Sequence, residues 1–104
     1  MKAFMAVYVT FNNSLYVPTA FTPNRDGVND KFVVKSRGVA VYNIQIFNRW
    51  GQLVFSSNNA SVHWDGKFKG ELQPAGSYVH IVTYCFFGQE KEKLMQKGAF
   101  TLIR

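Results

Sequence analysis

Hydrophobic and polar residues alternate with period two along much of the chain, in short runs separated by turn residues. We predict strands over residues 3–11, 15–20, 31–35, 39–48, 52–56, 77–87 and 93–104. The run 77–87 has apolar side chains on both alternating faces, which is typical of a strand in the centre of a sheet. About seven short strands in 104 residues, with helical character only in a turn at 89–94, predict an all-β fold, an Ig-like antiparallel β-sandwich.

The segments between these runs contain specific turn residues. Asn48-Arg49-Trp50-Gly51 predicts a tight hairpin turn in which Gly51 supplies a positive φ. Further turn signals are Asp65-Gly66, Lys69-Gly70 and Pro74-Ala75-Gly76. Each signal lies next to a predicted strand and therefore supports the strand assignment.

Composition fits a single domain with its own core. Apolar residues make up 47 % of the chain and charged residues 17 %, and Cys85 has no second cysteine with which to form a disulfide. No run approaches the roughly 20 apolar residues of a membrane span. The apolar start of the chain reads as a strand rather than a signal peptide, because β-branched and aromatic residues dominate it and no small-residue cleavage site follows. We expect a monomer with no direct membrane insertion.

The charge balance suits either an anionic partner or a basic surface that is simply solvated. Lys and Arg number 12 against 6 Asp and Glu, which gives a formal net charge of +6. The basic residues are spread along the chain rather than clustered. Lys97-Gly98-Ala99-Phe100 has alanine where the aromatic strand of an RNA-recognition motif has Phe or Tyr. We therefore expect no nucleic-acid partner.

The loop 22–30 is the most unusual segment of the sequence. It places oxygen-bearing side chains around Gly27, namely Asn24, Asp26, Asn29 and Asp30. Calcium prefers such ligands, but an EF-hand register would put Val33 where a bidentate glutamate is needed. A turn whose Asx side chains hydrogen-bond their own backbone is favoured over a calcium site at these four residues.

Side chains that could support catalysis are few. His63 lies near a turn, and His80 and Cys85 alternate with core positions in a predicted strand. The closest carboxylate pairs lie in polar segments where a raised pKa is not expected. We predict no enzymatic activity, no metal centre and no cofactor. Trp50 and Trp64 form a sugar-stacking platform if they are exposed, and cover the end of the core if they are buried.

Four motifs in a fixed order carry a family resemblance. They are VPTAFTPNRDGVND (17–30), IFNRWGQLVF (46–55), WDGKFKGELQPAGSYVHIV (64–82) and KGAFTLIR (97–104). The chain resembles the gliding motility-associated C-terminal domain family, the type B sorting domains of the type IX secretion system. One departure is Arg25, where the family usually has glycine. The motif residues with expected structural roles are Gly27, Asp30, Arg49, Trp50, Gly51, Trp64, Asp65, Gly66, Pro74, Gly76 and Tyr78.

The resemblance implies a secretion signal carried as a folded domain over residues 15–104, with 1–14 as a linker or the end of a preceding domain. Its partners would be the type IX secretion proteins of the outer membrane and the N-terminal cargo domains of the same polypeptide. The cargo would pass through the periplasm to the cell surface or the medium. Expected recognition residues are those of the last motif: Lys97, Gly98, Phe100, Leu102 and Arg104. The alternative is a carbohydrate-binding module that uses Trp50 or Trp64.

Overall fold

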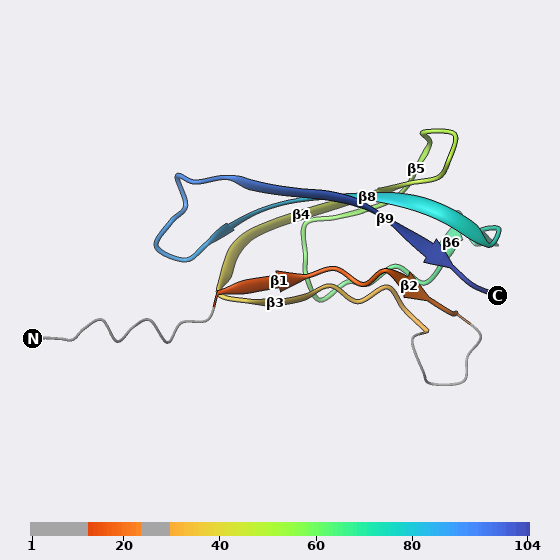
Figure 1. The fold of residues 1–104 in the computed structure, drawn as a ribbon, viewed down its shortest axis with the longest axis horizontal. Coiled ribbons are helices and arrows are strands. Elements are labelled where there is room, and N and C mark those ends of the chain that lie inside the picture. The colour runs from red at the N-terminus through yellow and green to blue at the C-terminus, as the bar shows by residue number, and fades with distance from the viewer. Residues whose placement is uncertain (1–12, 24–29) are drawn as a thin grey trace, which may run out of the picture.

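The computed structural model describes residues 13–23 and 30–104, and these form strands and turns without a helix. The strands are β1 (Ser14–Tyr16), β2 (Ala20–Phe21), β3 (Lys35–Arg37), β4 (Val39–Phe47), β5 (Leu53–Ser57), β6 (Lys67–Phe68), β7 (Glu71–Leu72), β8 (Gly76–Phe86) and β9 (Leu94–Leu102). Figure 1 shows two layers, a long sheet above and the β1–β3 pair below. The predicted all-β sandwich is confirmed.

The larger sheet has the order β2-β9-β8-β4-β5. β8 lies at its centre and pairs antiparallel with β4 on one side and with all nine residues of β9 on the other. The prediction that 77–87 forms a central strand is confirmed, because both neighbours cover its backbone. β2 is the exception to the antiparallel pattern, since it pairs parallel with the end of β9 through Ala20↔Thr101 and Phe21↔Leu102.

The core lies between this sheet and the smaller layer. Its most buried large side chains are Trp64, Phe21, Phe32, Phe100, Ile44, Ile46, Leu102 and Val82. Trp64 is 1 % exposed, and its ring lies 5.3 Å from that of Tyr78 and 5.6 Å from that of Phe21, measured between centroids. Its indole N–H donates a 2.8 Å hydrogen bond to the carbonyl of Lys67, so this buried donor is paired. Trp64 therefore covers the core, and the exposed alternative for this residue is excluded.

His80 is also part of the core. It is 5 % exposed, faces Gly98 across the β8–β9 pair, and stacks on Phe100 with 6.2 Å between ring centroids. A Cβ at Gly98 would lie only 3.1 Å from the His80 Nε2 atom. Glycine at position 98 thus makes room for the imidazole ring, and burial lowers the pKa of His80.

Several predicted strands differ in extent from the observed ones. The run 15–20 divides into β1 and β2 around Pro18, which has no N–H to donate to a ladder. In the run 31–35, Phe32 makes an isolated bridge to Trp64, and β3 begins only at Lys35. The hairpin of β6 and β7 was not predicted as strands. Lys69 and Gly70, with φ of 54° and 82°, form its turn. The predicted strand 3–11 lies outside the described residues.

Candidate recognition surface

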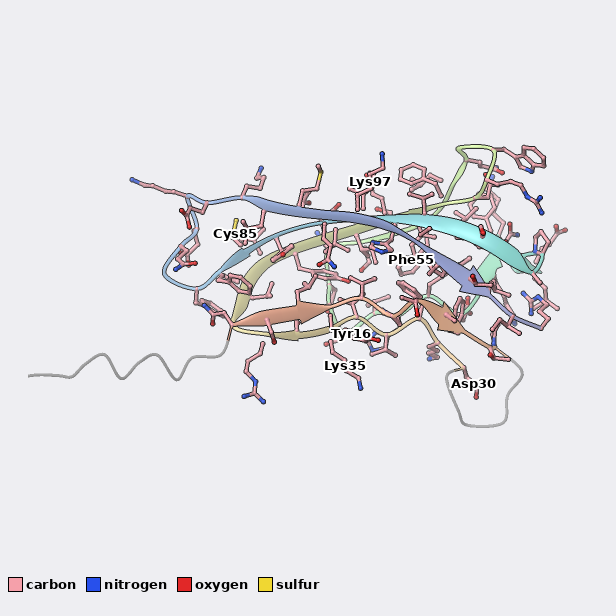
Figure 2. The ribbon with its side chains drawn as sticks, in the orientation of Figure 1. Tyr16, Asp30, Lys35, Phe55, Cys85 and Lys97 are labelled. Carbon is pink, nitrogen blue, oxygen red and sulfur yellow. The ribbon has the colours of Figure 1, made fainter. Side chains whose placement is uncertain are left out.

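The last strand divides its side chains between the core and the surface. Phe100 and Leu102 are 2 % and 0 % exposed, and Gly98 lies against His80. Lys97 is exposed and points away from the smaller layer, above the sheet in Figure 2. Of the five predicted recognition residues, Gly98, Phe100 and Leu102 thus shape the core, while Lys97 and Arg104 are exposed to solvent.

One edge of β9 is open over most of its length. The N–H of Thr101 donates to Thr19 O at 2.9 Å and the N–H of Ile103 donates to Phe21 O at 3.0 Å, so the odd-numbered residues present their backbone groups away from β8. β2 covers only the end of this edge. Among the described residues, no strand pairs with the part of the edge at Met95, Lys97 and Ala99. These N–H and C=O groups can accept an additional strand.

Arg104 holds the end of β9 against the preceding loop. Its Nε and Nη2 atoms donate to the carbonyl of Gln73 at 2.8 and 2.6 Å, and Nη2 also donates to Gly66 O at 3.3 Å. The guanidinium therefore joins the last residue to the loops on both sides of the β6–β7 hairpin. Its charge is exposed, but its position is fixed by structural contacts.

The turn between β4 and β5 lies at the same end of the sandwich, as the loop at the upper right of Figure 1. Its backbone closes through Gly51 N–H to Asn48 O at 3.0 Å and Asn48 N–H to Gln52 O at 2.9 Å. The Asn48 Oδ1 atom accepts the N–H groups of Trp50 and Gln52, both at 2.9 Å. Gly51 has φ of 83°, which confirms the predicted hairpin turn and its positive-φ glycine.

This turn presents Trp50 to solvent. Trp50 is 80 % exposed, and the Cζ atom of Arg49 lies 5.4 Å from the centre of its ring, a cation–π arrangement. A pocket of about 140 Å³ lies beside the pair and is lined by residues 48–50 of the turn, by the loop 73–75 and by the first residues of β8. Figure 2 shows side chains projecting from the tip of this loop into open space. The sequence alone does not distinguish Trp50 from Trp64, but in the structure Trp50 is exposed and Trp64 is buried.

Tyr78 connects the turn with the end of β9. Its hydroxyl donates to Pro74 O at 2.6 Å, and its ring is buried. Burial raises the pKa of Tyr78, and the positive charges of Arg104 and Arg49 act in the opposite direction. Both guanidinium groups therefore lie close to Tyr78, at one end of the sandwich. Arg49 also lies near Gly76: a Cβ atom added to this glycine would be 3.6 Å from the Arg49 Nη2 atom.

The remaining candidates from the sequence are the calcium loop, metal-binding side chains and Cys85. Three of the calcium candidates, Asn24, Asp26 and Asn29, lie outside the described residues, as does Gly27, while Asp30 lies within them. Within residues 13–23 and 30–104, no three His, Cys, Asp or Glu side chains come together as metal ligands. The Cys85 thiol is buried and lies 3.6 Å from the carbonyl oxygen of Glu90. No helix in this part of the chain could cross a bilayer.

The open edge of β9 and the exposed turn at Trp50 are surface features of a folded β-sandwich, as in a recognition domain. The comparison with known families makes the assignment specific. Residues 15–102 match the CHU_C type IX secretion signal domain, and the chain belongs to this family. A search of curated proteins finds no match to the chain.

Membership of this family establishes the role of the domain. It is a sorting signal that directs a larger cargo polypeptide through the type IX secretion system to the cell surface or the medium, and the secretion machinery recognises it. No finding favours the carbohydrate-binding alternative.

Proposed function

We propose that the secretion machinery reads this signal as a folded surface along the last strand, where Lys97 and Arg104 supply positive charge. The observation that carries the proposal is the open edge of β9, which lies beside the exposed side chain of Lys97. Because Phe100 and Leu102 are in the core, a partner meets the strand through its backbone edge and its outward side chains. Recognition therefore requires the intact sandwich.

Charge supports this arrangement. The net charge of +6 raises the rate of encounter with an acidic partner, and most strongly at low salt. Lysine on an open strand edge also discourages unspecific pairing between copies of the domain. Lys97 thus favours an acidic partner and opposes self-association, which agrees with the expected monomer.

The route of the cargo follows from the same proposal. The cargo domains, N-terminal in the same polypeptide, enter the periplasm by their own signal peptide. The folded domain then addresses them to type IX secretion proteins of the outer membrane. The domain acts by binding, without a catalytic step or a cofactor.

The test uses the whole chain fused behind a periplasmic reporter in cells that carry the type IX system. We expect Lys97→Glu to lower the rate at which the reporter leaves the cell by about tenfold. The matched control is Lys35→Glu, the same charge change on β3 in the opposite layer (Figure 2). Both positions are exposed, so neither change should alter the free energy of unfolding by more than about 0.5 kcal/mol.

Arg104 needs a separate design because its guanidinium makes structural hydrogen bonds. Arg104→Lys keeps the charge and weakens those bonds, whereas Arg104→Gln removes the charge. If charge guides recognition, Arg104→Lys is exported faster than Arg104→Gln at equal stability. Export of Lys97→Glu at the wild-type rate, with Lys35→Glu also unchanged, would show that recognition rests on another face.

A further inference from the structure

The tip of the β4–β5 turn exposes a large apolar side chain that the fold does not require. At 80 % exposure, Trp50 is the most exposed of the large hydrophobic residues in the described part of the chain. An exposed indole gains nothing from the hydrophobic effect in the free domain. Tryptophan and arginine are enriched among the residues that carry most of the binding energy at protein interfaces.

Hydrogen bonds fix the backbone of the turn that carries Trp50 before any partner binds. The side chain of Asn48 accepts two backbone N–H groups, and its own amide donates to Gln52 Oε1 at 3.0 Å. Arg49 lies against the indole ring. Because its backbone is already ordered, the turn loses less conformational entropy on binding than a mobile loop would.

The chemistry of the tip selects the kind of partner. Arg49 has no carboxylate partner among the described residues, and no residue lining the adjacent pocket carries a carboxylate. The guanidinium of Arg104, which like that of Arg49 acts on Tyr78, adds positive charge at the same end of the sandwich. The complement of this surface is an apolar cavity with acidic residues at its rim.

We propose that Arg49 and Trp50 form a binding tip that inserts the indole into an apolar, acid-rimmed cavity on a protein of the secretion machinery. This inference rests on the role of the domain as a sorting signal and adds a second contact, apart from the edge of β9. A sugar is a poorer occupant, because the Asn48 amide and the Oε1 atom of Gln52 are already hydrogen-bonded within the turn. The Cζ atom of Arg49 also lies over one face of the ring, 5.4 Å from its centroid.

The first experiment measures export of the same reporter fusion. We expect Trp50→Ala to lower the export rate at least tenfold, and Arg49→Gln to lower it severalfold. The matched control is Phe87→Ala, since Phe87 is 68 % exposed in the turn after β8, at the opposite end of the large sheet. Thermal unfolding of all three variants should match that of the wild type. Equal losses for Trp50→Ala and Phe87→Ala, or none for Trp50→Ala, overturn the proposal.

The second experiment observes Trp50 directly and does not depend on export. The purified chain is mixed with outer-membrane vesicles from cells with the type IX machinery, and its tryptophan emission is recorded. We expect a blue shift, absent with vesicles from cells that lack the machinery and absent in Trp50→Phe. No shift with either kind of vesicle overturns the proposal. A shift produced by soluble glycans, or by raising the concentration of the chain alone, also overturns it.

The two proposals fail separately. Normal export of Lys97→Glu with impaired export of Trp50→Ala rejects guidance by charge at β9 and supports the tip. The reverse pattern rejects the tip and leaves the edge of β9 as the recognised feature.

Discussion

Replacement of Trp64 tests the account of the core most directly. The side chain is 1 % exposed and contacts several other rings, so its removal leaves a cavity that rigid aromatic neighbours cannot fill. Truncation of a buried tryptophan to alanine costs about 3–5 kcal/mol. The lost hydrogen bond to the Lys67 carbonyl adds about 1 kcal/mol. We expect Trp64→Ala to lose about 4–6 kcal/mol of the free energy of unfolding.

That loss is large for a domain of this size, whose total stability is on the order of 5–15 kcal/mol. Trp64→Phe is a milder variant that remains folded enough to measure. It keeps one aromatic ring but loses the N–H donor, and should lower the free energy of unfolding by about 2 kcal/mol. Urea unfolding followed by circular dichroism gives both values. In a Trp50→Phe background all tryptophan emission comes from Trp64, and acrylamide should quench it weakly. A cost below about 1 kcal/mol for Trp64→Ala, or free quenching, would refute the burial of this side chain.

Three further predictions concern β8, β9 and the last residue. Burial lowers the pKa of His80, so the unfolded chain binds a proton near pH 6.5 that the native state does not. The melting temperature should therefore fall as pH drops below about 6.5, and less so in His80→Phe. Gly98→Ala should lower the free energy of unfolding in the wild type, but leave it unchanged or raise it in a His80→Ala background, where the imidazole is gone. A double-mutant cycle should therefore give a coupling energy of about 1 kcal/mol between the two positions. Arg104→Met should cost about 1 kcal/mol in urea unfolding, against about 0.5 kcal/mol or less for Lys97→Met, and equal costs would contradict the structural role of the guanidinium.

The long strands could be predicted because their side chains alternate over many residues. β4, β8 and β9 have nine to eleven residues each and were all predicted within a few residues of their ends. The turn at Gly51 was predictable because a positive φ favours glycine. In these segments local sequence and tertiary structure favour the same conformation.

Short and long-range features could not be predicted in the same way. β6 and β7 have two residues each, too few for any periodicity, and depend on the unusual φ of Lys69. The parallel pairing of β2 with β9 joins segments from opposite ends of the sequence, and no local pattern encodes it. The opposite environments of Trp50 and Trp64 have the same origin. Both residues lie near turns, and only the packing of the two layers determines which of them is buried.

Many residues of the motifs that identify the family therefore have structural roles. Trp64, Phe100 and Leu102 are core residues, and Gly98 makes room for His80. A domain can keep all of these residues and still differ in the surface that it offers to a partner, because they pack inside the sandwich. If the secretion machinery binds a folded surface, as we propose, the side chains that it contacts are motif residues that the fold leaves exposed. Trp50 meets that condition most clearly, since it belongs to a motif of the family, is 80 % exposed and has its backbone N–H bonded to Asn48 in the turn. A motif residue that the core does not explain is where recognition should be sought first.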